Sequence, residues 1–434
     1  MIKNYHAAIE YLYTRLPMFT RDGAKAIKVD IANTVRFCQA LGDPQMQFKA
    51  IHVAGTNGKG STSHMLAAIL GAAGYKTGLY TSPHLVDFRE RIRIDGVMIP
   101  EERVLDFVQR EQAVMEAIQP SFFEATVAMA FDYFAAEKVD IALIEVGLGG
   151  RLDSTNIIHP ELCVITNIGM DHMDMLGSTL PEIAAEKAGI IKAGVPVVIS
   201  ERDERIAEVF ETKSQGMQAP LRFASDAWRV QQVERQNQGL LVQVADQLSH
   251  EVKAWYVGLA GYYQQKNLLG VLTAVDTLRE QGWQISEEQL RDGLANVMAY
   301  TGLQGRWQTL STDPWVICDT GHNADGIREV VENIDSLDYA RLHMVIGAMR
   351  DKDLNGVLMQ LPKDAYYYFG SPDMPRAMPA EELAEKAAAY GLVGSAYASV
   401  ASALAAAHGA YQPADLIFVG GSTFVVAEVM AKQF

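Results

Sequence analysis

A glycine-rich segment, Gly55 to Ser61, constrains the fold of this chain more than any other feature. It follows an apolar run, Phe48 to Ala54, and precedes a helical pattern, so the order is strand, loop and helix. Glycines let backbone N–H groups turn toward an anion, and the following helix presents its positive N-terminus. Lys59 can neutralise phosphate, and the hydroxyl of Ser61 or Thr62 can contact magnesium. We therefore predict an ATP phosphate site formed by Thr56, Asn57, Gly58, Lys59, Gly60 and Ser61.

The spacing of this loop differs from that of the common P-loop, in which four residues separate the first glycine from Gly-Lys-Ser/Thr. Here Lys59 follows Gly58, and another glycine, Gly60, precedes Ser61. A glycine-rich turn with an incidental lysine is the alternative interpretation. The order of strand, loop and helix favours the nucleotide site, because phosphate binding requires that order.

Length and composition indicate a globular protein with more than one domain. A chain of 434 residues exceeds what one hydrophobic core usually serves, so two or three domains are expected. With 49% hydrophobic and 21% charged residues, the composition is that of an ordinary soluble protein. The net charge of -16 argues against nucleic acid as a partner.

Cysteine usage and hydropathy predict the compartment. Cys38, Cys163 and Cys318 are scattered and lack metal-ligand spacing, so we expect buried thiols in a reducing environment. The N-terminus has no signal-like apolar segment, and no stretch is long and apolar enough to span a bilayer. We therefore expect a cytoplasmic monomer with no membrane partner.

Two α/β domains are predicted. Over residues 1–298, short apolar runs alternate with helical patterns, as in a P-loop-type domain around a parallel sheet. Alternating runs at 228–233, 240–244 and 252–257 predict antiparallel strands at the edge of that sheet. Residues 298–305 hold two glycines and little periodicity, so the boundary is placed at 298/299. Residues 299–434 then predict a smaller, doubly wound, Rossmann-like domain.

Two local signals in the first domain are specific. A helix is predicted over 180–192, because Thr179 can cap its start and Glu182 lies three residues further on. Glu145 closes a strand that begins at Ile141. This places a carboxylate at the C-terminal edge of the sheet, where open α/β folds bind ligands.

Seven segments, in order along nearly the whole chain, resemble the folylpolyglutamate synthase and dihydrofolate synthase family. That family belongs to a wider group of ATP-dependent ligases that includes the Mur cell-wall enzymes. The segments are GTNGKGS at 55–61, TSPHL at 81–85, EVGLGGRLDSTN at 145–156, TNIGMDH at 166–172, EKAGIIK at 186–192, GRW at 305–307 and DTGHN at 319–323.

The resemblance implies that Ser82, Glu145 and His172 hold magnesium near the γ-phosphate of ATP. It also implies that Lys187 is carbamylated to N-carboxylysine. An uncharged amine reacts with CO₂ to give an anion, which supports a metal ion that an ammonium would repel. Without the motif, an ammonium paired with Glu186 or Glu182 on a solvated helix face would be the preferred interpretation.

The acceptor substrate is expected beside two further segments. The turn Gly147 to Gly150, followed by Arg151 and Asp153, could alone be a tight strand exit, but the resemblance places it beside the substrate. The segment at 122–124 resembles the pterin-contacting part of the family, with rings for stacking and a carboxylate that accepts from ring N–H groups. Its residues are Phe122, Phe123 and Glu124. Core packing is an equally good role for one of the two phenylalanines.

In the second domain, the resemblance implies that Arg306 and Asp319 contact ATP, together with Asn267 of the first domain. It places His322 near the amino-acid side of the cleft, where His322 is our candidate general base for the incoming amine. The relatives mostly read Asp-Gly-Ala-His-Asn-Pro in this segment. Here Ala324 replaces the proline that would start the next helix.

The predicted function is ligation of L-glutamate to dihydropteroate, to a folate or to both, through an acyl phosphate made from ATP with Mg²⁺. Lys59, Lys187 and His322 are the catalytic candidates. A Mur-type ligase of a UDP-muramyl acceptor is one alternative, but such enzymes usually carry an extra N-terminal domain. Only ~50 residues precede the loop here, about the lower end of a domain's size. A nucleotide-regulated binding protein is the other, and it would not need the metal-site residues or Lys187.

Overall fold

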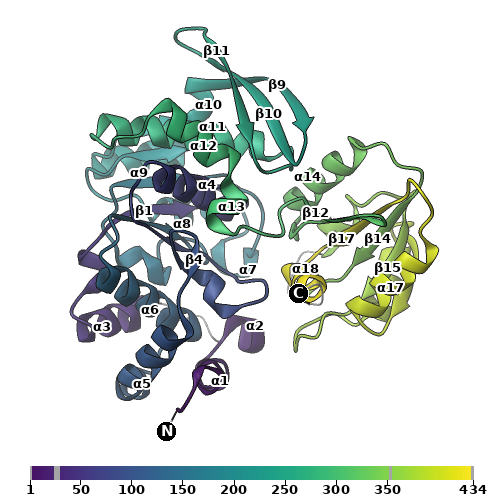
Figure 1. Ribbon diagram of the computed structural model, residues 1–434, viewed down its shortest axis with the longest axis horizontal. Coiled ribbons are helices and arrows are strands. Elements are labelled where there is room, and N and C mark those ends of the chain that lie inside the picture. The colour runs from purple at the N-terminus through teal and green to yellow at the C-terminus, as the bar shows by residue number, and fades with distance from the viewer. Residues whose placement is uncertain (1, 24–29, 351–353, 432–434) are drawn as a thin grey trace. The chain divides into compact units, whose positions relative to one another are not determined.

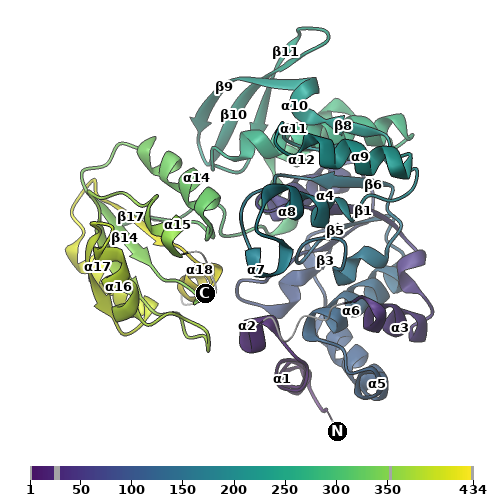
Figure 2. The same ribbon diagram turned by 180° about the vertical axis from the view of Figure 1, so that it is seen from behind.

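The computed structural model describes residues 2–23, 30–350 and 354–431, and the chain divides into two compact units (Figures 1 and 2). The first unit comprises the chain up to Gly169, then Met173–Gly258 and Gln264–Leu303. The second comprises Met170–His172, Leu259–Tyr263 and the chain from Gln304. The last crossing between units therefore lies shortly after the predicted boundary at 298/299.

The first unit is built on an eight-stranded sheet. Its strands are β1 (Lys49–Ala54), β2 (Thr77–Tyr80), β3 (Ile92–Ile94), β4 (Val97–Met98), β5 (Ile141–Glu145), β6 (Leu162–Ile165), β7 (Val197–Ile199) and β8 (Leu221–Phe223). Their order across the sheet is β4-β3-β2-β5-β1-β6-β7-β8, parallel except for β3 and β4 at one edge. Val53 pairs with both Glu145 and Val164, so the central strands β5, β1 and β6 end level with one another.

Helices cover both faces of this sheet, which explains why its central strands are buried along almost their whole length. The helices are α1 (Tyr5–Arg15), α2 (Phe19–Asp22), α3 (Ala32–Ala40), α4 (Lys59–Ala72), α5 (Glu101–Ile118), α6 (Phe122–Glu137), α7 (Met173–Leu176), α8 (Leu180–Ala188), α9 (Ala207–Met217), α10 (Ala224–Ala227), α11 (Gln264–Glu280), α12 (Glu287–Ala295) and α13 (Val297–Thr301). Helices α4 and α11 pack on one face, and α6, α8 and α9 on the other.

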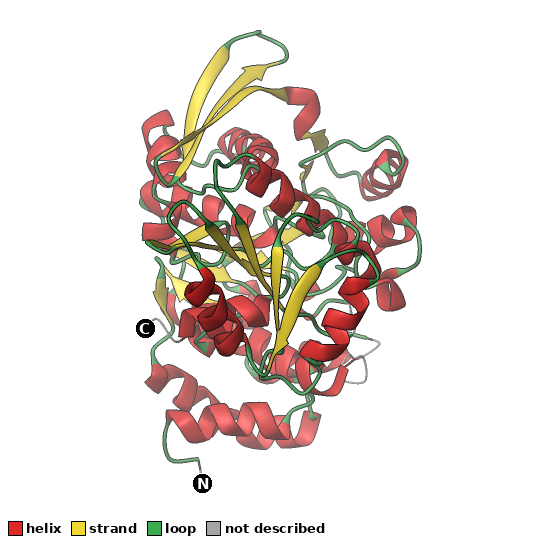
Figure 3. Cartoon of the chain, turned by 90° about the vertical axis from the view of Figure 1, so that its right-hand side faces the viewer, coloured by secondary structure: helices red, strands yellow, loops and turns green. Residues whose placement is uncertain are grey.

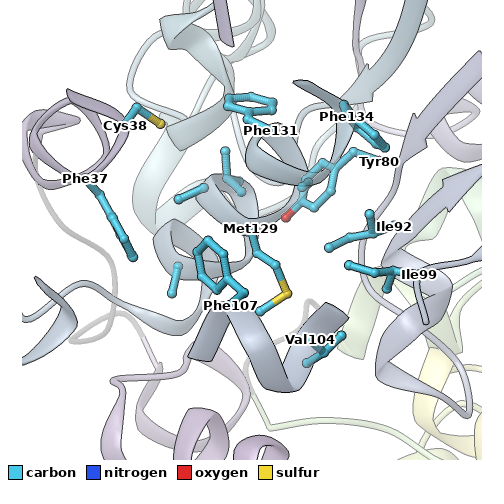
Figure 4. Close-up of a cluster of buried hydrophobic side chains, with 14 of the residues drawn as sticks. Phe37, Cys38, Tyr80, Ile92, Ile99, Val104, Phe107, Met129, Phe131 and Phe134 are labelled. Atoms are coloured by element: carbon cyan, nitrogen blue, oxygen red, sulfur yellow. The ribbon is translucent and has the colours of Figure 1, made fainter. Parts of the chain in front are cut away.

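A large buried cluster holds α3, α5 and α6 against the sheet (Figure 4). Its side chains include Phe37, Cys38, Tyr80, Ile92, Phe107, Met129, Phe131 and Phe134. A capping box fixes the start of α6, because Ser121 accepts from the N–H of Glu124 and Glu124 accepts from the N–H of Ser121. The core and the cap together place residues 122–124.

Helix α8 begins as predicted and ends earlier than predicted. Thr179 and Glu182 form the expected capping box, but the helix stops at Ala188 rather than 192. A Cβ at Gly189 would lie 2.4 Å from Cβ of Arg151, so the chain passes too close to continue with an ordinary side chain. Lys192 lies beyond the helix, where its Nζ donates to the carbonyl oxygen of Asn156 at 2.8 Å.

The antiparallel strands expected at the edge of the large sheet instead form a sheet of their own. This three-stranded sheet has the order β11-β10-β9, with β9 (Trp228–Gln236), β10 (Gly239–Asp246) and β11 (Val252–Val257) (Figure 1). The short helix α10 separates β9 from the edge strand β8, which ends the large sheet there. The small sheet packs on α11 and α12, with Arg291 of α12 4.4 Å above the ring of Trp255.

The second unit is a six-stranded, doubly wound sheet, which confirms the predicted architecture. Figure 3 shows yellow strands with red helices to either side. The strands are β12 (Gln308–Thr312), β13 (Trp315–Cys318), β14 (Leu342–Ile346), β15 (Tyr366–Gly370), β16 (Val393–Tyr397) and β17 (Leu416–Gly420), in the order β12-β13-β17-β14-β15-β16. Only β12 is antiparallel to its neighbour. The edge strands β12 and β16 escaped the sequence analysis because partial exposure leaves them few apolar residues.

Helices lie on both faces of the second sheet as well. They are α14 (Ala324–Asp335), α15 (Leu354–Leu358), α16 (Ala380–Ala388), α17 (Val400–Ala410) and α18 (Thr423–Ala431). The first three share a buried cluster with one face of the sheet, and α17 and α18 pack on β14, β15 and β17.

Candidate functional site

The glycine-rich loop joins β1 to α4 as the sequence predicts. Gly55 has φ +147° and Gly58 has φ +86°, conformations that side chains rarely adopt. There is also no room for a side chain. A Cβ would lie 1.9 Å from Oγ1 of Thr166 at Gly55, and 2.3 Å from Oδ1 of Asn267 at Gly58. Both glycines are therefore required by the shape of the loop and by the side chains packed on it.

The strand exit after β6 holds the first half of this loop. Asn167 accepts from the N–H of Thr56 through its carbonyl oxygen at 2.8 Å, and from the N–H of Asn57 through Oδ1 at 2.7 Å. Helix α4 has its first internal hydrogen bond from the N–H of Thr62 to the oxygen of Gly58. The N–H groups of the first turn of α4 therefore face the helix N-terminus, the end to which anions bind.

Two lysines converge on the loop. Nζ of Lys59 donates to the carbonyl oxygens of Gly55 and Thr56, each at 3.0 Å. Nζ of Lys187, from α8, donates to the same oxygen of Gly55 at 2.9 Å. Lys187 is 4% exposed, so it does not lie on a solvated helix face. The structure thus brings together two residues that are far apart in the sequence and that were both predicted to be catalytic.

The start of α11 packs on the other side of the loop. Gln264 is buried, its Nε2 donates to Oγ of Ser61 at 3.0 Å, and its Oε1 accepts from Nδ2 of Asn267 at 2.8 Å. The predicted ATP residue Asn267 therefore lies beside Gly58 and is linked to the hydroxyl of Ser61. Gln264 was missed in the sequence analysis, although it lies three residues before Asn267.

Ser82 and Glu145 lie together at the C-terminal edge of the large sheet. Glu145 is the last residue of β5 and is buried, and its Oε2 accepts from the N–H of Ser82 at 3.2 Å. These hard oxygen donors at a strand end are of the type that magnesium prefers. Among the described residues, no group of three or more His, Cys, Asp or Glu side chains forms a metal-binding cluster. The third predicted ligand, His172, is grouped with the second unit.

Asp153 is committed to the turn that precedes it. Its Oδ2 accepts from the N–H of Leu148 at 2.8 Å and its Oδ1 from the N–H of Thr155 at 3.0 Å. Burial raises the pKa of Asp153, and hydrogen bonds from Thr155 and backbone N–H groups oppose the rise. Arg151 instead extends to the surface, where Nη2 pairs with Oε1 of Glu186 at 2.8 Å. Asp153 therefore shapes the turn, and Arg151 is the more accessible of the two.

The two phenylalanines at the start of α6 differ in their surroundings. Phe122 is buried in the core cluster, with its ring centroid 5.4 Å from that of Tyr13 and the guanidinium of Arg91 5.2 Å above it. Phe123 is only partly buried, and its ring lies against Gly147, where a Cβ would be 2.4 Å from Cζ. Core packing is thus the role of Phe122, while Phe123 faces the glycine turn.

Only one of the two carboxylate oxygens of Glu124 accepts a hydrogen bond from a described residue. Oε2 accepts from the N–H of Ser121 at 2.6 Å. Oε1 is buried and has no hydrogen-bond partner among the residues that the structure describes. A buried acceptor without a donor is costly, so a ligand N–H would stabilise it.

A partly buried chain of polar side chains next to Phe122 was also missed. Nε of Arg91 donates to Nδ1 of His84 at 2.7 Å, and Nε2 of His84 lies 3.2 Å from the hydroxyl of Tyr13. Burial, followed by the charge of Arg91, lowers the pKa of His84 to about 3, so the ring is neutral. His84 lies two residues after Ser82 in TSPHL, which is the signal that could have identified it.

In the second unit, Asp319 organises the predicted ATP residues. Its Oδ2 accepts from the hydroxyl of Tyr263 at 2.6 Å and from the N–H of Trp307 at 2.7 Å, and its Oδ1 accepts from the N–H of Gly321 at 2.7 Å. Burial raises the pKa of Asp319. Nη1 of Arg306 donates to the hydroxyl of Thr320, so Arg306 and Asp319 belong to one connected loop structure.

The carboxylate of Asp171 lies near two histidines of the second unit, His172 and His322. Its Oδ2 lies 3.7 Å from Nε2 of His322 and accepts from Nδ2 of Asn323 at 3.1 Å, and its Oδ1 lies 3.9 Å from Nε2 of His172. Nδ1 of His322 lies 2.9 Å from the carbonyl oxygen of Thr320. A carbonyl can only accept, so Nδ1 carries a proton. Asp171 was not singled out in the sequence, although it lies in the TNIGMDH segment.

The missing proline before α14 has a local substitute. Oδ1 of Asn323 accepts from the N–H of Gly326 at 2.8 Å and so caps the helix. The departure from the family pattern therefore leaves the helix start defined.

Comparisons with known proteins agree with this architecture. Residues 53–275 match the Mur ligase middle domain, and residues 305–423 match the Mur ligase, glutamate ligase domain. A dihydrofolate synthase/folylpolyglutamate synthase of Bacillus subtilis is 34% identical over 395 residues, covering 88% of this chain and 89% of that protein. The E. coli FolC structure in complex with DHPP and ADP is similar with TM-score 0.86 and 31% identity, covering 99% and 98% of the two chains.

A third similar structure is a bifunctional folylpolyglutamate synthase/dihydrofolate synthase with Mn, AMPPNP and L-glutamate bound. It has TM-score 0.82 and 30% identity, covering 99% of this chain and 98% of that one. In the part of the chain that the structure describes, no helix is both long and apolar enough to cross a membrane.

Proposed function

The chain belongs to the dihydrofolate synthase/folylpolyglutamate synthase family of ATP-dependent glutamate ligases, and from this premise we propose the substrates and the residues that act on them. The acceptors are dihydropteroate, a folate or both. The terminal phosphoryl group of ATP passes to the acceptor carboxylate, which gives an acyl phosphate and ADP. The amine of L-glutamate then attacks the acyl carbon, phosphate leaves, and an amide forms with loss of the amine proton.

Named ligands of similar structures support this choice of substrates. E. coli FolC was solved with DHPP and ADP, and a second structure holds Mn, AMPPNP and L-glutamate. A Mur-type ligase is not favoured, because relatives that match along most of the chain are dihydrofolate synthase/folylpolyglutamate synthases. The binding-protein alternative does not account for two lysines, one of them buried, that converge on the nucleotide loop.

The convergence of Lys59 and Lys187 on the oxygen of Gly55 carries the mechanistic part of the proposal. Lys59 neutralises the charge that develops on the transferred phosphoryl group, and the N-terminus of α4 supplies N–H donors to it. Because the reaction is mainly a matter of positioning, the rigid glycine loop contributes by fixing the phosphates.

Magnesium is proposed at Ser82 and Glu145, with His172 as the third ligand. The fit rests on the Glu145 carboxylate at the end of β5 and on the neighbouring Ser82, whose side chain also carries an oxygen. The metal would supply charge neutralisation at the phosphates. Glu145 is the residue of this set that contributes charge, and Ser82 orients it through the backbone N–H.

N-carboxylysine is proposed at Lys187. Because both ammonium groups bind one oxygen, their nitrogens lie within about 6 Å of each other, where like charges repel. Carbamylation converts one cation into an anion: the ammonium first loses a proton, and the amine nitrogen then bonds to the carbon of CO₂ with loss of a second proton. The carbamate nitrogen keeps one N–H, so the hydrogen bond to Gly55 is compatible with the modification.

The acceptor is proposed to lie against Phe123 and the turn Gly147 to Gly150, with Oε1 of Glu124 accepting from a ring N–H. The unused buried oxygen of Glu124 supports this placement. His322, whose Nδ1 donates to the oxygen of Thr320 and whose Nε2 lies 3.7 Å from Oδ2 of Asp171, is proposed to accept the proton of the glutamate amine at Nε2, where the carboxylate would stabilise the resulting imidazolium.

The decisive experiment measures ADP release by the purified protein with ATP and Mg²⁺. ADP should form only when L-glutamate and a pteroate or folate are both present, because phosphoryl transfer to water is suppressed without them. The product should be the pteroate or folate with one more glutamate by mass. Transfer of an amino acid to a UDP-muramyl acceptor, with no turnover of any pteroate or folate, would contradict the proposal.

A further inference from the structure

His52 is a fully buried histidine in β1, the strand that leads into the nucleotide loop. Its Nε2 lies 2.9 Å from Oγ1 of Thr155, in the short helix η4 (Ser154–Ile157). Its Nδ1 is buried and has no hydrogen-bond partner among the described residues. An apolar side chain would fill this position without a buried polar atom, so the imidazole requires an explanation.

In the hydrogen bond between His52 and Thr155, the donor and the acceptor can be assigned. The hydroxyl of Thr155 also bonds Oδ1 of Asp153, and a carboxylate can only accept, so Thr155 donates to Asp153. The oxygen of Thr155 is then the acceptor for N–H on Nε2 of His52. Burial lowers the pKa of His52 to about 3, which keeps the ring neutral with its lone pair on Nδ1. The order is therefore His52 to Thr155 to Asp153.

The hydrogen bonds continue from Asp153 into the glycine turn. Asp153 accepts from the N–H of Leu148 at 2.8 Å, and its own N–H donates to the oxygen of Gly150 at 3.2 Å. The turn in contact with the ring of Phe123 is thus linked to β1 through the side chains of His52, Thr155 and Asp153. Backbone pairing with β1 ends at Val146, whose N–H donates to the oxygen of Val53 at 2.9 Å, and the hydrogen bonds of Asp153 extend the connection to Leu148 and Gly150.

We propose that His52 is a positioning residue that fixes the turn Gly147 to Gly150 relative to β1, and so keeps the acceptor subsite at a constant distance from the nucleotide loop. The inference rests on the proposed function, since it takes this turn to lie beside the pteroate or folate. A histidine that only stabilised the fold would change the amount of active enzyme and leave the KM values alone.

The test compares kcat and both KM values for His52→Leu, Thr155→Val and His52→Gln in the full chain. Leu and Val remove the hydrogen bond, and the KM for the pteroate or folate should rise about threefold to tenfold, as for loss of one neutral hydrogen bond. The KM for ATP should stay within about twofold, because the loop 55–61 keeps its own contacts to Asn167. Gln presents an N–H near the place of Nε2 and should restore the acceptor KM.

A second buried histidine–threonine pair in the same unit provides the matched control. Nδ1 of His64, in α4, lies 2.7 Å from Oγ1 of Thr301, in α13, so this pair belongs to elements other than β1, η4 and the glycine turn. His64→Leu and Thr301→Val should lower stability without raising the acceptor KM. Thr155→Ser, which keeps the hydroxyl, controls for the substitution of Thr155 itself.

Equal changes in both KM values, or a loss of kcat alone with the acceptor KM unchanged, would overturn the inference. If His52→Leu does not fold, comparison of the acceptor KM of Thr155→Val with that of Thr155→Ser decides the same question.

Hydrogen exchange distinguishes failure of this inference from failure of the proposed function. The amide of Leu148 should exchange at least about tenfold faster in Thr155→Val than in wild type, whatever substrate the enzyme uses. Unchanged exchange at Leu148 would also overturn the inference.

Discussion

Lys59 and Lys187 donate to one and the same carbonyl oxygen, that of Gly55, at 3.0 and 2.9 Å. One lysine belongs to the glycine loop and the other to α8. Two cations on one backbone oxygen repel each other, and the burial of Lys187 leaves little water to screen them. Conversion of Lys187 to a carbamate removes this repulsion, and the first prediction follows from it.

Lys187→Ala should be nearly inactive in glutamate-dependent ADP release, because the anion at this position is lost. Added short carboxylic acids should restore part of the activity by occupying the vacated space. Lys192→Met is the control: Lys192 donates to the oxygen of Asn156, so this variant should keep its activity and gain nothing from the acids. A bare amine at Lys187 in electron density, from crystals grown with metal at mildly alkaline pH, would refute the modification.

Glu145→Gln should lower kcat/KM by more than tenfold, which is about 1.4 kcal/mol of barrier. The amide keeps the shape and the contact to the N–H of Ser82 but loses the charge proposed to hold the metal. Thermal unfolding of the variant should overlay that of wild type. Glu186→Gln, which loses only the surface pair with Arg151, should remain active. Activity of Glu145→Gln within tenfold of wild type would show that the metal assignment is wrong.

Phe122→Ala should mainly lower stability, whereas Phe123→Ala should mainly weaken binding of the acceptor. Phe122 is buried in the core cluster, so its truncation should cost about 3–5 kcal/mol of unfolding free energy in a denaturant titration. Phe123→Ala should instead raise the KM for the pteroate more than that for ATP, as expected for a stacking contact worth about 0.5–1.5 kcal/mol. An unchanged pteroate KM in Phe123→Ala would remove Phe123 from the acceptor site.

Stability should depend on pH through His52. Burial lowers its pKa in the folded protein to about 3 from an ordinary 6.5, so between these values the unfolded chain binds the proton more readily. This contribution is fully present above pH 6.5 and is lost progressively as the pH falls toward 3. His52→Gln lacks it, so the unfolding free energy of wild type relative to the variant should fall by about 2 kcal/mol between pH 7.5 and 5.

Thr155→Val retains the histidine and is the control for the pH experiment. Its difference from wild type in unfolding free energy should change less between the two pH values than that of His52→Gln, because the histidine remains; any remaining pH dependence reports Asp153, whose pKa the hydrogen bond from Thr155 lowers. A constant difference for His52→Gln would mean that His52 takes up a proton in the folded protein as readily as in the unfolded chain.

Local signals in the sequence determined the elements that bear the site. The glycine loop, the capping box of Thr179 and Glu182 and the strand end at Glu145 depend on residues close together in the chain, and all are found where the sequence predicts them. The resemblance of the motifs to one ligase family was confirmed by the comparisons. The edge strands were missed because partial exposure weakens the apolar pattern that identifies a strand.

The tertiary structure decided which polar groups meet. Lys187 contacts Gly55 across 132 positions of the chain and His52 contacts Thr155 across 103, and neither distance leaves a trace in local periodicity. The oxygens of Asp153, a predicted substrate ligand, accept hydrogen bonds within its own turn. Phe122 is buried in the core cluster, whereas Phe123 is partly buried and packs against it. Side-chain burial and hydrogen-bond partners depend on how strands and helices pack. Residue type and spacing therefore predict which residues are candidates for the site, and the tertiary packing determines which groups each of them contacts.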